Sequence, residues 1–454
     1  MSTAQAFEHA RALHAAGRLQ DAIEGYSALL ERLADTGFLH FFRGQAAYGL
    51  GRLEEAEADF RAQLALTPEH PQTLEYLGDA QRNLGRLDEA FETYEALSRL
   101  APENADAFFR AALARKTVSE DAFFNRLERF VDETPLTAER ASAGFGLAKA
   151  LGDLGREDQQ MEVLHRANAA LRQSYAFDLQ QVEQQFDLIK TVFSAEALAK
   201  AAPIEVEAAP IFIVGMPRSG STLTESILAA MPGVTAGGEL TTLSETLGAY
   251  EQAGGRADAL PGAVPQNRVS LAQIYTNAVR QRFPGAERFT DKMLGNFALI
   301  GVIRLILPRA SLIQMRRNGL DMGWSIYANH FLGTLHPYAY DLAELGGYIA
   351  LYEDLMAHWR DLAPQALHIQ SYEALVGDAE GESRRMAEFC DLDWSRDCLD
   401  VNKRRGAQWT RSSDQVRNPI HMAGVGRGQA RAEALSAFTD GYESWRERLA
   451  KKAR

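Results

Sequence analysis

A segment near the middle of the chain has the spacing of a phosphate-binding loop. Gly215 and Gly220 are separated by four residues, and an apolar run precedes them. Backbone N–H groups in such a loop, ahead of a helix, can enclose a phosphate. A phosphotransferase acting on nucleoside triphosphates has lysine where this chain has Ser221, so the loop suits a less charged donor. The loop offers one cation and three hydroxyls: Arg218, Ser219, Ser221 and Thr222.

The loop resembles the 5′-phosphosulfate-binding loop of sulfotransferases that use 3′-phosphoadenosine 5′-phosphosulfate, particularly the branch related to tyrosylprotein sulfotransferases. Further segments follow in that family's order, and the resemblance covers about residues 210 to 430. They are Gly237-Gly238-Glu239, Thr290-Asp291-Lys292, Leu312 to Asn318 with Arg317, then Ser325, Ser371 to Leu375 with Tyr372, and Ser413 to Pro419 with Arg417.

The resemblance implies a catalytic role for Glu239, Lys292 and Arg218. A carboxylate at the carboxyl edge of a sheet can take the proton of an acceptor hydroxyl, as a general base does. A lysine beside the bridging oxygen stabilises the charge that develops on the leaving phosphate. The alternatives are that Glu239 is a solvated loop residue and that Lys292 only pairs with Asp291.

The same resemblance implies the donor-binding residues. Arg317 and Ser325 are expected to hold the 3′-phosphate, through a guanidinium fork and a hydroxyl. Tyr372 is expected near the adenine, and Arg417 in a late loop over the nucleotide. The loop residues Arg218, Ser219, Gly220, Ser221 and Thr222 are expected at the 5′-phosphosulfate.

A basic segment near the C-terminus supports an anionic ligand. Residues 403–431 contain seven Lys and Arg and a single acid, Asp414. A solvated loop is the alternative, and nucleic-acid binding is a third interpretation that Trp409 alone supports weakly. The histidines lack paired ligand spacing, so no metal site is predicted.

The resemblance implies a sulfotransferase that moves a sulfuryl group from 3′-phosphoadenosine 5′-phosphosulfate to an acceptor hydroxyl without a metal. The expected acceptor is a protein tyrosine or a hydroxyl of a small molecule or glycan. Two alternatives stay open: a kinase-like phosphotransferase with a phosphate-binding loop, and a non-catalytic scaffold with a vestigial nucleotide-binding domain.

The elements that position these residues are those of an α/β domain with a central parallel sheet. Residues 211–214 are an apolar run suited to a buried strand, residues 311–315 are expected as a second strand, and residues 224–231 suit a helix. We expect the sulfotransferase domain to span residues 211–454, with a connecting helix and a linker over 173–210.

A repeated pattern in the first part of the chain predicts an all-α tetratricopeptide solenoid over residues 1–172. Gly17-Arg18-Leu19 recurs at Gly51 and Gly85, a period of 34 residues. Alanine and aromatic positions keep the same phase, namely Ala22, Ala56 and Ala90, then Tyr26, Phe60 and Tyr94. Residues Gly152 to Arg156 form a weaker copy of the turn.

The composition sets the remaining expectations. The chain has 454 residues, 48 Lys and Arg, 61 Asp and Glu and a net charge of −13, which disfavours nucleic acid as a partner. Two cysteines and no apolar run long enough for a membrane span predict a cytoplasmic protein. The solenoid predicts a docked peptide or protein. The alternatives are homodimerisation and recruitment of a biosynthetic partner for a small hydroxylated metabolite or glycan.

Overall fold

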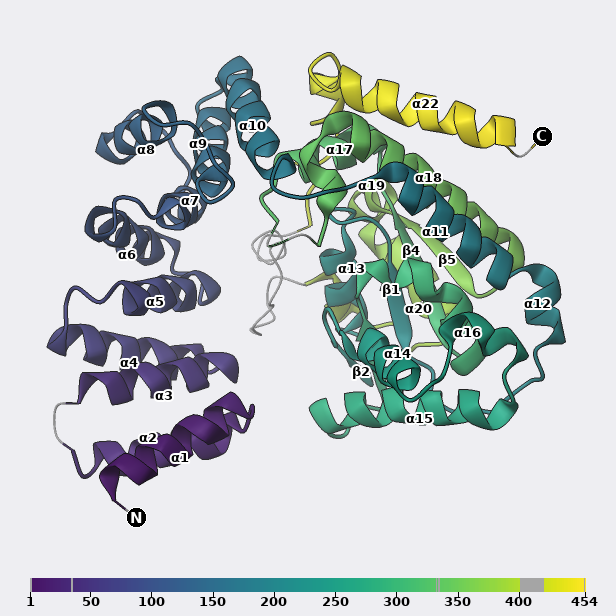
Figure 1. Ribbon diagram of the computed structural model, residues 1–454, viewed down its shortest axis with the longest axis horizontal. Coiled ribbons are helices and arrows are strands. Elements are labelled where there is room, and N and C mark those ends of the chain that lie inside the picture. The colour runs from purple at the N-terminus through teal and green to yellow at the C-terminus, as the bar shows by residue number, and fades with distance from the viewer. Residues whose placement is uncertain (1, 34–35, 332, 334, 401–419, 453) are drawn as a thin grey trace. The chain divides into compact units, whose positions relative to one another are not determined.

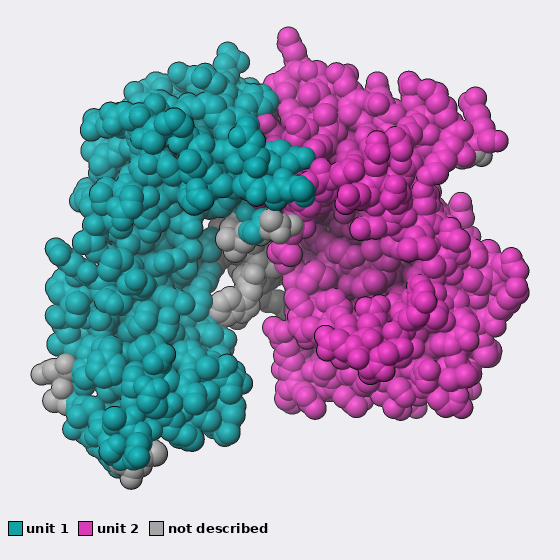
Figure 2. Space-filling model, in the orientation of Figure 1, with its two compact units in different colours: residues 1–176, 328–333 teal, residues 177–327, 334–454 magenta. Residues whose placement is uncertain are grey.

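The computed structural model describes residues 2–33, 36–331, 333, 335–400, 420–452 and 454, which form two compact units (Figure 1, Figure 2). Unit 1 comprises Met1–Ala176 and Ala328–Gly333, and unit 2 comprises Phe177–Tyr327 and Thr334–Arg454.

Unit 1 is a solenoid in which most helices pack against their sequence neighbours, while α7 and α8 both pack against α9 (Figure 1). Its helices are α1 (Thr3–Ala15), α2 (Leu19–Leu30), α3 (Gly37–Gly49), α4 (Leu53–Leu66), α5 (Pro71–Asn83), α6 (Leu87–Leu100), α7 (Ala105–Ala114), α8 (Ala122–Asp132), α9 (Ala141–Asp153) and α10 (Glu157–Arg172).

The turn inside each hairpin repeats the same geometry. Gly17, Gly51, Gly85 and Gly155 have φ angles of 74°, 75°, 81° and 74°, a conformation that glycine adopts without a Cβ penalty. The phased alanine and aromatic side chains are fully buried at 0% exposure: Ala22, Ala56, Ala90, Tyr26, Phe60 and Tyr94. The structure therefore confirms the predicted helical repeats, including the weaker copy at Gly155.

Residues 328–333 belong to unit 1 although they lie far from it in sequence. Within this unit the His330 ring packs 5.4 Å from the Phe109 ring and 5.2 Å from the Phe145 ring, measured between centroids. His330 is therefore a packing residue in an aromatic cluster.

Unit 2 contains the predicted parallel sheet, with strand order β2-β3-β1-β4-β5, in which each strand pairs in parallel with its neighbours. Its strands are β1 (Ile211–Val214), β2 (Val234–Thr235), β3 (Arg288–Asp291), β4 (Ser311–Arg316) and β5 (Leu367–Ser371). All four β1 residues are buried, as the continuous apolar run predicted for a central strand.

The helices of unit 2 surround this sheet. They are α11 (Leu179–Val192), α12 (Ala195–Lys200), α13 (Ser221–Leu228), α14 (Thr242–Gln252), α15 (Pro265–Arg282), α16 (Ile300–Ile306), α17 (Gly319–Tyr327), α18 (Leu342–Leu362), α19 (Tyr372–Gly377), α20 (Ala379–Phe389) and α22 (Ser436–Lys452). Short 3-10 helices are η1 (Ala257–Gly262), η2 (Leu294–Leu299), η3 (Pro337–Tyr340), η4 (Arg396–Leu399) and η6 (Gln429–Arg431). Figure 1 shows α22 lying alongside α18, against which it packs.

The structure and the sequence differ at the helix after the phosphate loop. This helix, α13, spans Ser221–Leu228 and not residues 224–231, because Gly220 takes the N-cap position. Helix α11 lies within residues 173–210, where a connecting helix was expected, and it packs against α18 in unit 2. No helix among the described residues is long and apolar enough to cross a bilayer.

Candidate active site

The predicted site residues follow directly after the strands of the sheet. Because parallel strands place their carboxyl ends at one edge, this topology gathers residues that are far apart in sequence. The phosphate loop follows β1, Gly237 to Glu239 follow β2, Lys292 follows β3, Arg317 follows β4 and Tyr372 follows β5.

The phosphate loop is a strained turn that opens a helix. Arg218 has a φ of 65°, rare for a residue with a Cβ, and Gly220 has a φ of 95°. Gly220 is the N-cap of α13 and supplies no capping side chain. N–H groups of the first helical turn are therefore suited to donate hydrogen bonds to a ligand oxygen. The Ser219 hydroxyl is directed away from this role, because it donates to the Met216 carbonyl at 2.7 Å. Ser221 and Thr222 lie in the first turn of α13.

Lys292 and Glu239 form a close pair. Lys292 Nζ lies 2.9 Å from Glu239 Oε1, and the lysine side chain is 1% exposed whereas the Glu239 side chain is 52% exposed. The site therefore joins a buried ammonium to a carboxylate that is half exposed to solvent.

The alternative pairing of Lys292 with Asp291 is not what the geometry favours. The Asp291 carboxylate accepts hydrogen bonds from Tyr275 Oη at 2.8 Å, the Met293 N–H at 3.1 Å and Asn296 Nδ2 at 3.2 Å. Burial is the main reason that the pKa of Asp291 rises to about 7.

The turn before Glu239 is held by hydrogen bonds to the backbone of Gly237 and Gly238. The Gly237 N–H donates to Thr290 Oγ1 at 3.1 Å, and the Lys292 N–H donates to the Gly238 carbonyl at 2.8 Å. A Cβ on Gly237 would lie 2.1 Å from the Thr290 carbonyl oxygen, so only glycine fits there. Gly238 has a φ of 71°, which also favours glycine.

Arg317 connects the phosphate loop to a segment near the C-terminus. Its Nη1 donates to the Arg218 carbonyl at 2.7 Å, and its Nη2 donates to the Gly424 carbonyl at 2.6 Å. The guanidinium lies 4.7 Å from the centroid of the Tyr372 ring. Burial lowers the pKa of Arg317, and its Nε has no hydrogen-bond partner among the described residues.

Ser325, on α17, accepts a hydrogen bond from Arg218 Nε at 3.1 Å. The two residues predicted for opposite ends of the donor, Arg218 and Ser325, therefore meet. A side-chain hydrogen bond therefore links the phosphate loop to α17.

The predicted Arg417 lies outside the described residues, as do Lys403, Arg404, Arg405 and Arg411 of the basic segment. Of that segment, Arg427 and Arg431 are described, and the Arg431 guanidinium lies 4.6 Å from the Trp324 ring.

Two carboxylates that sequence reasoning did not single out organise the site. Asp321 accepts the N–H groups of Gly426 at 2.7 Å and Gly428 at 2.6 Å, which fixes the C-terminal segment on α17. Glu225 of α13 accepts the Gly238 N–H at 2.9 Å. In the sequence, both residues appear only as an acid among apolar and small residues of a predicted helix. This pattern indicates a role in the site only once the residues that pack against the helix are known.

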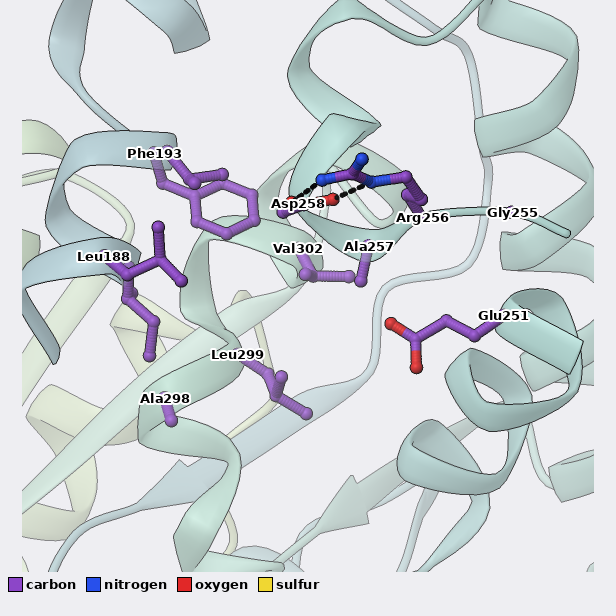
Figure 3. Close-up of a pocket in the computed structure, with 12 residues that line it drawn as sticks. Leu188, Phe193, Glu251, Gly255, Arg256, Ala257, Asp258, Ala298, Leu299 and Val302 are labelled. Atoms are coloured by element: carbon purple, nitrogen blue, oxygen red, sulfur yellow. Dashed lines mark hydrogen bonds and ion pairs between the residues drawn. The ribbon is translucent and has the colours of Figure 1, made fainter. Parts of the chain in front are cut away.

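A separate depression in unit 2 does not involve these residues. It has a volume of about 440 Å³ and is walled mainly by apolar side chains of α11, η2 and α16, including Leu188, Phe193 and Leu299 (Figure 3). Its polar residues are Glu251 and the ion pair of Arg256 with Asp258. None of the predicted site residues lines it. The described residues contain no group of three or more side chains suited to a metal ion.

Comparison with known families assigns the two parts of the chain. Residues 210–396 match the model of the sulfotransferase family, and residues 7–71 and 43–105 match the tetratricopeptide repeat. The chain therefore carries tetratricopeptide repeats in its N-terminal part, followed by a sulfotransferase-family domain.

Individual relatives are more distant. An uncharacterized protein of Aquifex aeolicus is 33% identical over 300 residues, which are 63% of this chain and 39% of that protein. A protein-tyrosine sulfotransferase of Drosophila melanogaster is 24% identical over 263 residues, 51% of this chain and 49% of that protein. The chain thus spans half or less of the length of these two relatives. Among solved structures, the sulfotransferase domain from the Synechococcus PCC 7002 olefin synthase is 19% identical, with a TM-score of 0.38. The alignment covers 52% of this chain and 97% of the chain of that structure.

Proposed function

We propose that this protein transfers a sulfuryl group from 3′-phosphoadenosine 5′-phosphosulfate to an acceptor hydroxyl. The observation that carries the proposal is the buried Lys292 ammonium, 2.9 Å from the exposed Glu239 carboxylate, at the edge of the sheet that also holds the phosphate loop. The match of residues 210–396 to the sulfotransferase family supports it.

The residues present fit such a donor. The uncapped first turn of α13, with Ser221 and Thr222, suits the 5′-phosphosulfate, and Arg218 adds a positive charge beside it. The buried Nε of Arg317, which has no partner in the described part of the chain, suits an added anionic oxygen. We therefore assign the 3′-phosphate to Arg317 and Ser325.

The donor supplies the sulfuryl group and leaves as 3′-phosphoadenosine 5′-phosphate. Glu239 accepts the proton of the acceptor hydroxyl while the hydroxyl oxygen bonds to sulfur. Lys292 and Arg218 stabilise the negative charge that develops on the departing phosphate oxygen. These three residues supply the positive and basic groups of the reaction, so we expect turnover without added magnesium.

Calorimetric titration of 3′-phosphoadenosine 5′-phosphate and of ATP, each with and without magnesium, tests this proposal. We expect binding of the bisphosphate that is independent of magnesium and stronger than binding of ATP. Magnesium-dependent binding of ATP alone would indicate a phosphotransferase, and binding of neither nucleotide would indicate a scaffold.

Arg317→Ala should weaken binding of the bisphosphate about 10- to 100-fold, because charge-assisted hydrogen bonds contribute about 1.5–3 kcal/mol. The matched control is Arg316→Ala, since Arg316 is the adjacent arginine and its side chain is exposed. Equal effects of the two changes would contradict the assignment of Arg317 to the 3′-phosphate.

The acceptor is a protein tyrosine or a hydroxyl of a small molecule or glycan. The repeats favour a peptide or protein acceptor, because a solenoid offers an extended docking surface. The two buried cysteines form no disulfide, which favours a reducing, cytoplasmic compartment. Incubating lysate fractions with radiolabelled donor separates these acceptors: label in protein tyrosine supports docking, and label only in small molecules contradicts it.

A further inference from the structure

Glu225 is a buried carboxylate that contacts three parts of the candidate active site. Its Oε1 accepts hydrogen bonds from the Gly238 N–H at 2.9 Å and from Thr290 Oγ1 at 2.8 Å. Its Oε2 lies 3.8 Å from Lys292 Nζ, and its side chain is 10% exposed. One side chain of α13 therefore joins the phosphate-loop helix to the turn before Glu239 and to the end of β3.

These contacts address an electrostatic problem of the proposed reaction. Lys292 is 1% exposed, and a buried ammonium is stable only beside a negative partner. Its nearest carboxylate is Glu239, which becomes neutral when it takes the acceptor proton. Glu225 then remains as the charged carboxylate beside Lys292.

A second consequence concerns geometry. Thr290 donates to Glu225 and accepts from the Gly237 N–H, while Glu225 accepts from the Gly238 N–H. The N–H groups of Gly237 and Gly238 are thus both hydrogen-bonded, which fixes the turn that precedes Glu239. Because Glu225 lies on the helix that starts at the phosphate loop, the base is held in register with the donor-binding loop.

We propose that Glu225 is a positioning residue for sulfuryl transfer, which keeps Lys292 oriented and charged and fixes the Gly237-Gly238 turn that carries Glu239. The inference rests on the proposed function. Glu225 acts through Lys292 and Glu239 and does not itself exchange a proton with the acceptor.

Glu225→Gln is the test variant, because glutamine keeps a carbonyl oxygen for Gly238 and Thr290, while the negatively charged oxygen that faces Lys292 is replaced by a neutral amide nitrogen. We expect kcat to fall at least about 10-fold, the effect of removing one group that acts at the transition state. The KM for the donor and the Kd for 3′-phosphoadenosine 5′-phosphate should stay within about two-fold of the native values. Glu245→Gln on α14 is the control, since that residue is exposed and bonds to Thr241.

A double-mutant cycle with Lys292→Ala separates positioning from general stability. If Glu225 acts through the lysine, Glu225→Gln should reduce single-turnover rates much less in the Lys292→Ala background than in the native background. Equal reductions in both backgrounds, or a raised KM with unchanged kcat, would overturn the inference. Thermal unfolding and bisphosphate affinity of each variant establish that it is folded.

The native chain serves as the reference that tells the two claims apart. Sulfuryl transfer by the native protein together with full activity of Glu225→Gln overturns the role of Glu225 and leaves the proposed function in place. Absence of transfer by the native protein overturns the proposed function, and the inference with it.

Discussion

The hairpin turns of the solenoid and the phosphate loop of the sheet domain both contain residues at positive φ, but different contacts hold them. Gly17 and Gly155 have φ angles of 74°, and a Cβ added to either would meet nothing within 4 Å. Gly220 has a φ of 95°, and a Cβ there would lie 2.5 Å from the Tyr372 ring. The solenoid turns are thus determined locally, whereas the phosphate loop depends on residues from a distant strand end.

Arg218 makes the same contrast sharper. It takes a φ of 65° without being glycine, while its carbonyl accepts from Arg317 and its guanidinium donates to Ser325. A non-glycine residue in this region costs about 1–2 kcal/mol, so surrounding contacts must maintain it. Arg218 and Asp391 are the non-glycine residues at positive φ in the described part of the chain, and Arg218 lies where a ligand is proposed to bind.

Gly220→Ala is the change with the largest expected effect on this contrast. The new methyl group meets both an unfavourable φ and the Tyr372 ring, so the loop must shift. We expect affinity for 3′-phosphoadenosine 5′-phosphate to fall at least about 10-fold, measured by calorimetry. Native affinity in this variant would show that the loop geometry is not what binds the nucleotide.

Asp291→Asn extends the contrast to buried acids. In the solenoid, the buried Glu57 carboxylate pairs with Arg61 and Arg86, whereas Asp291 receives hydrogen bonds from neutral donors. Burial raises the pKa of Asp291 from 3.8 to about 7, so the folded state binds more protons than the unfolded state between these values.

The stability that Asp291 contributes is therefore fully present below about pH 4 and is lost as the pH rises through about 7. Urea unfolding followed by tryptophan fluorescence reports on unit 2, because all five tryptophans lie after residue 300. The native free energy of unfolding minus that of Asp291→Asn should fall between pH 4 and 7. A flat difference would contradict the raised pKa.

Gly155→Ala is the smallest expected change. The methyl group enters open space, so the cost is the conformational penalty alone, about 1–2 kcal/mol in the stability of the solenoid. Hydrogen exchange of α9 and α10 should increase while bisphosphate affinity stays native. Weakened nucleotide binding would show that the two units are energetically coupled.

The sequence was most informative where structure is determined locally. The 34-residue period predicted the hairpins and their glycine turns, since each repeat carries the same residues at the same positions. The buried strand 211–214 and the phosphate loop were also predictable, because an apolar run followed by a glycine-bounded loop has few alternatives.

Contacts between distant segments could not be predicted in this way. Nothing in the sequence near Glu225 indicates Gly238, Thr290 or Lys292 as its neighbours, because parallel pairing of β1 with β3 brings them together. In the sequence, Asp321 is an ordinary acid. In the structure, it accepts hydrogen bonds from the N–H groups of Gly426 and Gly428, more than 100 positions later in the chain. The α11 helix appeared as a connector because its packing partner, α18, lies far along the chain.

The central claim is that Glu239 takes the acceptor proton beside a donor bound by the phosphate loop and Arg317. Transfer of radiolabelled sulfate by Glu239→Gln, measured at saturating donor together with bisphosphate affinity, tests it most directly. The account predicts affinity within about two-fold of native and turnover reduced about 10²- to 10⁴-fold, the range for loss of a general base. Turnover equal to that of the native protein would contradict the account.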